Sequence, residues 1–134
     1  MEIALRAALL DWLAADPVIA AGCNVLAEEA PPEARPPWLG ISASASSDWS
    51  TKTWAGAEVR VALELQVRGD DPASAQALVD VIDARALALP HTADATVVSA
   101  RFLRSRSAAR PRNLRAHLRE YRFRLLAHHY GDPS

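Results

Sequence analysis

The sequence predicts an α+β fold, in which a mixed, mostly antiparallel sheet has two helices packed on one face and ends in a long C-terminal β-hairpin. Three observations predict it. In residues 58–68 every second side chain is Val or Leu and those between are polar except Ala62, the period-two pattern of a strand with one buried and one solvated face. Two segments carry apolar stripes at helical spacing, and two further strand-like segments complete the chain. Strands outnumber helices, so a two-layer arrangement is expected.

The N-terminal helix is expected over residues 2–15. Its apolar side chains recur at the spacing of one helix face: Leu5, Leu9, Trp12 and Leu13. Pro17 is expected to end this helix, because proline removes a backbone hydrogen bond from a helix interior. Four prolines between residues 24 and 37 exclude a helix or a central strand there, and they leave a short strand at residues 25–27 within an extended loop.

The middle of the chain predicts a strand and then an unusual loop. Residues 38–44 alternate in the manner of a strand. The next stretch, SSDWSTKTWAG at residues 46–56, holds two tryptophans, five hydroxyl side chains and the only lysine. Hydroxyls, Asp and Gly are typical of loops, and the hydroxyls can hold a loop in shape through bonds to its backbone. Tryptophan is costly to expose, so Trp49 and Trp54 are expected to cover another surface.

The second helix is marked by its capping residues. Asp71 is well placed as the N-cap and Pro72 as the first helical residue, and the helix is expected to run to about Leu87. Its apolar stripe consists of Ala75, Leu78, Val79, Ile82 and Ala86.

The last two strands are predicted over residues 95–104 and 113–127 and form a hairpin. Residues 105–112, SRSAARPR, contain three arginines and nothing to bury, so we expect a flexible hairpin tip or arm. Residues 128–134 are expected to be a flexible C-terminal tail.

Length and composition predict one domain over residues 1–134. A hydrophobic share of 50% and a charged share of 23% are typical of soluble proteins. The longest apolar runs are far shorter than the ~20 residues that span a bilayer, so no membrane partner is expected. No secretory signal is visible, and the single Cys23 excludes an internal disulfide. We therefore expect a soluble intracellular protein.

The charge is distributed unevenly along the chain. Residues 1–100 carry six Lys or Arg and fourteen Asp or Glu, whereas residues 101–134 carry nine Arg and two acidic residues. The two portions either neutralise each other within one subunit or form unlike patches that meet across a subunit contact. A third alternative is a basic surface for nucleic acid, which is disfavoured because Phe102, Tyr121 and Phe123 are expected to be buried and unavailable for base stacking.

The motifs of enzyme chemistry are missing. The glycines form no phosphate-binding loop, no GxSxG motif surrounds a serine, and the four histidines have no metal-ligand spacing. The neighbouring acidic pairs Glu28–Glu29 and Asp70–Asp71 lie in predicted loops, where acidic residues are usually solvated or cap helices. The sequence therefore predicts a protein that is not an enzyme and has no cofactor and no metal.

The chain as a whole resembles the small tail-completion family of long-tailed phages, the tail terminators, which includes equivalents in phage-derived gene transfer agents. The resemblance covers about residues 2–127. Its most specific part is DWSTKTWAGAEVRVALEL, in which a D-x-S-T loop leads into the alternating strand. Further parts are the ALRAALLDWLAADP helix, the ASAQALVDVIDARA helix and the VVSARFLRSRSAARPRNLRAHLREYRFRL hairpin.

The resemblance implies a structural protein with a mixed sheet flanked by helices and no catalytic residues. Members of this family typically form a hexameric ring on the head-proximal end of the tail tube, which stops tube polymerisation and joins the tail to the head connector. The implied partners are other copies of the chain, the major tail-tube protein and a head-side connector or stopper. DNA would pass through the ring without sequence-specific binding. The implied location is the tail or neck of a virion or phage-like particle assembled in the bacterial cytoplasm.

The candidate interface combines the tryptophan loop with the arginines. A ring needs two different patches that meet, and tryptophan and arginine are favoured in such contacts. The candidates are Trp49, Lys52, Trp54, Arg104, Arg106, Arg110, Arg112 and Arg115. The alternative for Trp49 and Trp54 is that both fold back over the edge of their own sheet.

Two other functions stay open at this point. The chain could be a head-side neck protein of the same particle, a stopper or adaptor. It could also be a small nucleic-acid-binding protein that uses the C-terminal arginine cluster.

Overall fold

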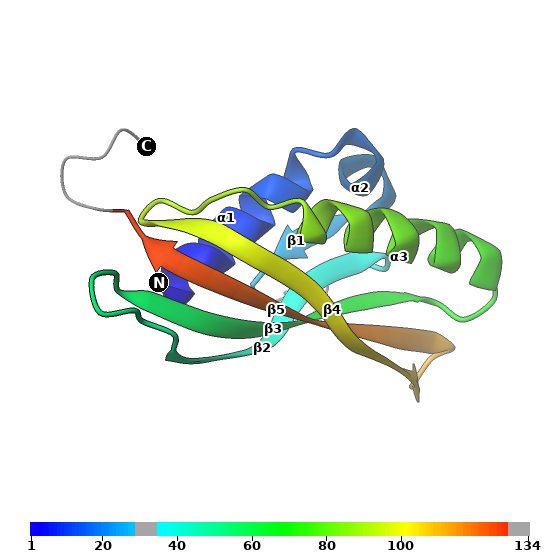
Figure 1. The fold of residues 1–134 in the computed structure, drawn as a ribbon. Coiled ribbons are helices and arrows are strands. Elements are labelled where there is room, and N and C mark those ends of the chain that lie inside the picture. Colours follow the sequence, from blue (N-terminus) through cyan, green and yellow to red (C-terminus); the bar gives the residue numbers. More distant parts are fainter. Residues whose placement is uncertain (29–34, 129–134) are drawn as a thin grey trace.

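The structure, a computed structural model, describes residues 1–28 and 35–128 (Figure 1). A five-stranded sheet has the order β1-β2-β3-β5-β4. β1 pairs with β2 in parallel, and the other pairs are antiparallel. The elements in chain order are α1 (Glu2–Ala14), α2 (Pro17–Gly22), β1 (Val25–Ala27), β2 (Trp38–Asp48), β3 (Gly56–Arg68), α3 (Pro72–Leu87), β4 (Ala95–Arg110) and β5 (Leu114–Ala127). The predicted α+β class, the mostly antiparallel sheet and the C-terminal hairpin are confirmed.

The helices lie on one face of the sheet, and the hydrophobic core fills the space between (Figure 1). The alternating side chains of β3 that were predicted to be buried are 0–6% exposed: Val59, Val61, Leu63, Leu65 and Val67. The same register places Phe123 of β5 beside Val59 and Tyr121 beside Val61, and both aromatic rings are fully buried. α1 contributes Leu5, Leu9 and Leu13 to this core.

The N-terminal helix ends ahead of Pro17, as predicted, but a short second helix that the sequence analysis did not predict follows it. α1 ends at Ala14, and Pro17 begins α2, so the helical layer holds two main helices and a short third one. The side chain of Asp16 caps α2 by accepting hydrogen bonds from the backbone N–H groups of Val18 and Ile19. An Asp-Pro pair is the same start signal that correctly marks α3 at Asp71–Pro72.

Two strands are longer than the sequence predicts. β2 continues to Asp48, so the first three residues of the predicted 46–56 loop belong to a strand. β4 continues to Arg110, so the predicted flexible arm at 105–112 is mostly paired strand, and the turn comprises residues 111–113. Pairing with β5 supplies the backbone partners that local sequence does not reveal. The predicted tail at 128–134 lies outside the described residues except for His128.

The two main helices are joined by a reciprocal contact between Trp12 of α1 and Arg85 of α3. The indole N–H of Trp12 donates to the Arg85 carbonyl at 2.7 Å, and Arg85 Nε donates to the Trp12 carbonyl at 2.8 Å. The guanidinium carbon of Arg85 lies 3.4 Å from the centroid of the indole ring, which adds a cation–π interaction.

A polar contact ties α3 to the sheet. The Asp83 carboxylate accepts hydrogen bonds from the guanidinium of Arg119, with Nε at 3.1 Å, and from the hydroxyl of Tyr121. Burial, together with the Asp83 carboxylate, raises the pKa of Tyr121 far above its usual value, so this hydroxyl remains a donor at all ordinary pH values. Asp83 thus holds the helix layer over β5.

Replacement of Asp83 by alanine is expected to lower the free energy of unfolding by about 2–4 kcal/mol, because it leaves the Tyr121 hydroxyl and the Arg119 guanidinium without their acceptor. Urea denaturation measures this loss. Asp80→Ala, one turn earlier on the same helix and exposed, is the matched control and should change the value by less than about 0.5 kcal/mol. Equal losses in the two variants would contradict the role assigned to Asp83.

Candidate functional site

The structure separates the predicted interface residues into two groups at opposite ends of the sheet (Figure 1). The tryptophans lie at the β2–β3 loop, whereas the arginines of the candidate set lie toward the β4–β5 turn. β3 pairs with β5 from Gly56–Leu126 to Arg68–Leu114, which at about 3.3 Å per residue is a length of about 40 Å. The tryptophan loop and the hairpin tip therefore do not form one surface.

The tryptophan loop is held in shape by its hydroxyl groups, as the sequence predicts. Ser50 Oγ donates to the Asp48 carboxylate at 2.6 Å and accepts from the backbone N–H of Gly56 at 3.0 Å. Thr51 Oγ1 accepts from the backbone N–H of Trp54 at 2.9 Å, and the Thr51 N–H donates to the Trp54 carbonyl at 2.8 Å. The loop is thus a defined turn.

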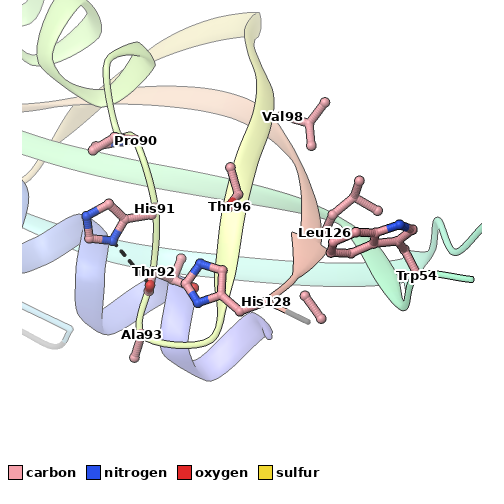
Figure 2. A pocket seen from close by; sticks show the side chains of 10 residues that line it. Trp54, Pro90, His91, Thr92, Ala93, Thr96, Val98, Leu126 and His128 are labelled. Carbon is pink, nitrogen blue, oxygen red and sulfur yellow. Dashed lines mark hydrogen bonds between the residues drawn. The ribbon is translucent and has the colours of Figure 1, made fainter. Parts of the chain in front are cut away.

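Both loop tryptophans are half-buried against their own chain. The guanidinium carbon of Arg124 lies 5.5 Å from the centroid of the Trp49 ring. Trp54 lines a surface hollow of about 620 Å³ near the start of β4. Figure 2 shows Trp54 and Leu126 on one side of this hollow and His91 on the other. Lys52, between the two tryptophans, is exposed.

The remaining candidates lie on different sides of the hairpin. The register places Arg104, Arg106 and Arg110 on the face of the sheet opposite the helices, because their cross-strand partners are Glu120, Leu118 and Leu114. Arg115 pairs with Val67 and so points to the helix side, beyond the core. Arg112 lies in the turn with a φ of 64°.

The face opposite the helices, which we name the open sheet face, carries more arginines than the candidate set. The even-numbered positions of β3 and β5 and their partners on β4 share this face. Its charged residues are Arg60, Arg68, Arg101, Arg104, Arg106, Arg110, Arg122 and Arg124, with Glu58, Glu64 and Glu120. Eight arginines against three glutamates give a formal charge of +5. The strict alternation of β3 and β5 could have identified the additional members.

Part of this charge is neutralised within the face. Glu58 accepts from Arg124 Nε at 3.1 Å and lies 3.9 Å from Nε of both Arg60 and Arg122. Arg104 pairs with Glu120 at 2.9 Å, and Arg110 Nη2 lies 4.0 Å from Glu64. These pairs support the expectation that acidic and basic residues neutralise each other within one subunit.

Ion pairs do not neutralise every arginine of the open sheet face. Arg68, Arg101 and Arg106 are exposed and make no ion pair with the residues that the structure describes. The neutralisation is therefore incomplete, and the surplus positive charge lies on one face.

The helix layer shows the opposite charge. In α1, α2 and α3, which are described completely, the exposed charged side chains are Asp11 and Asp80. The two helix arginines are half-buried: Arg6 pairs with Glu28 at 2.9 Å, and Arg85 stacks on Trp12. Half of the other exposed helix positions are alanine. The molecule thus has a basic face and an acidic, alanine-rich face on opposite sides of the sheet.

One Ser–His pair arises across the hairpin, where Ser107 Oγ lies 2.8 Å from His117 Nδ1. Burial, together with the charges of Arg115 and Arg119, lowers the pKa of His117. Its buried Nε2 has no hydrogen-bond partner among the described residues, so no carboxylate orients the ring as a catalytic triad requires.

Among the described residues, Cys23 is not activated as a nucleophile and no metal-binding cluster is formed. Burial raises the pKa of Cys23 to about 11, so the thiol is protonated at neutral pH. Within residues 1–28 and 35–128, no three His, Cys, Asp or Glu side chains lie close enough to share a metal ion. None of the described helices is both long and apolar enough to span a membrane.

Two of the three aromatic rings near the C-terminal arginines are buried and therefore unavailable for stacking on bases. Tyr121 and Phe123 are fully buried, as predicted. Phe102 lies on the same side of the sheet as its cross-strand partner Tyr121, as expected, but it is 40% exposed. It lies on the edge strand, at a bulge between Phe102 and Arg104. The Arg119 guanidinium lies 4.4 Å from the centroid of the Phe102 ring and covers part of it.

Gly56→Ala is expected to lower the free energy of unfolding by about 1–3 kcal/mol, because the new Cβ would lie 2.5 Å from the Trp49 carbonyl oxygen and 2.8 Å from that of Leu125. Urea denaturation followed by tryptophan fluorescence measures the loss. Gly69→Ala is the control, since its nearest neighbour is a side-chain oxygen of Asn113 at 3.0 Å. A smaller loss of unfolding free energy for Gly56→Ala than for Gly69→Ala would contradict the close packing of the tryptophan loop around Gly56.

Comparison with known proteins places the chain in a family. No curated protein sequence matches it. A chain of a solved structure described as the virion of a native gene transfer agent particle has the same fold, with a TM-score of 0.79 and 24% sequence identity over 92% of this chain and 95% of that chain. The family model described as tail completion protein gp17 matches residues 7–126. The chain therefore belongs to the tail completion protein gp17 family, whose members are structural and not enzymatic.

Proposed function

We propose that this chain is a tail terminator, a virion component that forms a closed ring, typically of six copies, on the head-proximal end of a tail tube. The observation that carries the proposal is the separation of charge between the open sheet face and the helix layer. A ring requires a heterologous contact, in which one patch of a subunit meets a different patch of its neighbour. A subunit with two oppositely charged faces can make such a contact repeatedly.

The proposed partners follow from this location. The major tail-tube protein contacts one side of the ring, which stops tube polymerisation, and the head-side connector or stopper contacts the other. DNA passes through the ring without sequence-specific contacts. The fold similarity to a chain of a gene transfer agent particle supports a role in such a particle or in a phage.

A head-side stopper or adaptor role in the same particle is the alternative, and it uses the same two faces. A nucleic-acid-binding role is less well supported. Three glutamates interrupt the open sheet face, and Tyr121 and Phe123 are buried on the other side of the sheet.

The proposal predicts that the chain caps tail tubes. Tubes polymerised from the tail-tube protein should stop growing when the chain is added, and electron microscopy should show a ring at one end. Native mass spectrometry of the capped particles should give a fixed number of copies. Addition of the chain to the isolated head-side connector distinguishes the alternative, since a stopper or adaptor would bind the connector and leave tube growth unchanged. A chain that remains single-copy with tubes present would contradict the ring.

The tryptophan loop gives a second prediction. If the hollow beside Trp54 is covered in the assembly, the fluorescence of the wild-type chain should shift on assembly. Trp54→Phe should lose that shift, whereas Trp49→Phe should keep it, because the Trp49 ring already contacts Arg124 of its own subunit. The two variants serve as controls for each other. An unchanged shift in Trp54→Phe would exclude this tryptophan from the contact.

A further inference from the structure

We infer that the open sheet face binds the helix layer of a second copy of this chain, with exposed arginines of one subunit facing Asp11 and Asp80 of the next. This inference rests on the proposed ring and names the two surfaces that form it. It differs from a contact made by a flexible arm, because β4 is paired strand as far as Arg110.

The surplus charge shows which arginines are available. Arg101 and Arg106 are exposed and have no ion-pair partner among the described residues, whereas Arg104 is already paired with Glu120. Arg101 and Arg106 lie on the edge strand β4, on the side of the sheet that no helix covers (Figure 1). A partner that brings carboxylates to this edge would neutralise charge that the subunit itself leaves unpaired.

The shape of the open sheet face indicates the kind of side chain that fits. A hollow of about 250 Å³ lies between β3, β5 and β4. Ala62 and Leu118 provide apolar lining, and Arg104, Arg106 and Glu120 provide charged lining. A carboxylate that rises from a smooth apolar surface fits such a hollow, since the carboxylate can reach the arginines while the apolar surface covers Leu118.

The helix layer has two exposed carboxylates that lie among alanines. Asp80 of α3 is followed on the same exposed face by Ala84 and preceded by Ala77 and Gln76; the side-chain amide of Gln76 donates a hydrogen bond to the Asp80 carboxylate at 2.8 Å. Asp11 of α1 is flanked in the same way by exposed Ala7 and by other exposed alanines one turn later. Both carboxylates are exposed among alanines, so each is accessible to a shallow hollow on a partner subunit.

The two faces lie on opposite sides of every copy, which determines how the copies associate. Each copy offers a basic face to one neighbour and an acidic face to the other, so the contact is heterologous. In the proposed ring, the rotation from one copy to the next closes the series of contacts. A symmetric dimer would instead place basic face against basic face. Charge complementarity therefore favours a second copy over duplex DNA as the occupant, because DNA would leave the acidic helix layer without a partner.

The test uses two charge-reversal variants of the full chain. The sheet variant carries Arg101→Glu and Arg106→Glu, and the helix variant carries Asp11→Arg and Asp80→Arg. Each reversal places like charges across the contact, so each variant alone should assemble roughly ten-fold or more weakly than wild type. Native mass spectrometry at moderate salt, with and without tail tubes, measures the number of copies, and circular dichroism with urea denaturation verifies folding.

Mixing the two variants provides the decisive measurement. In an equimolar mixture, the reversed sheet face of one variant meets the reversed helix layer of the other, and the two unchanged faces also meet. The mixture should therefore recover assembly to within a few-fold of wild type, with the variants alternating in equal numbers. A matched control with Arg112→Glu and Arg115→Glu reverses two exposed arginines that lie off the open sheet face, and it should assemble as wild type does.

The outcomes separate this inference from the proposed function. If wild type forms rings and both variants form them equally well, or the mixture fails to recover, the inference is wrong and the ring stands. If the sheet variant assembles normally but loses salt-sensitive binding to a short DNA duplex, DNA occupies the open sheet face and the inference is overturned. If wild type stays single-copy even with tubes, both proposals fail.

Discussion

The antiparallel pairing of β3 with β5 decides the face on which nearly every important side chain lies. Thirteen residue pairs run from Gly56–Leu126 to Arg68–Leu114 without a register shift. Because side chains alternate along a strand, this single register places the valines and leucines of β3 with Phe123 on one side and the arginines at even-numbered positions on the other. A slip of one residue would bury arginines and expose the core, so the hydrophobic pattern enforces the separation of charge.

The helix layer depends on that register in turn. Asp83 can hold α3 to the sheet because Arg119 and Tyr121 lie two residues apart on the helix side of β5. α3 then holds α1 through the stacking of Arg85 on Trp12. Arg85 is half-buried in this contact and Arg6 pairs with Glu28, so the exposed charged residues of the helices are Asp11 and Asp80. The two oppositely charged faces are therefore consequences of the same packing that stabilises the fold.

A protein that acts by assembly needs surfaces more than reactive groups, and this chain is consistent with that requirement. Its Ser–His pair has no orienting carboxylate, and its cysteine is held as a protonated thiol. What the described residues do provide is a shaped loop, a hollow beside Trp54 and a charged sheet face with an apolar floor. These features suit recognition between rigid bodies, in which complementary shape and charge set the specificity.

The sequence by itself determined the features that depend on local periodicity and capping. The alternation of residues 58–68, the Asp71 cap and the hydroxyl-rich loop all predict what the structure contains, because the signal lies within a few neighbouring residues. Only the tertiary structure decided how far β4 runs, since residues 105–110 find their hydrogen-bond partners in β5. It also separated the loop tryptophans from the arginines of the candidate set and revealed the open sheet face. Pairing register and layer packing join residues distant in sequence, and no local pattern contains that information.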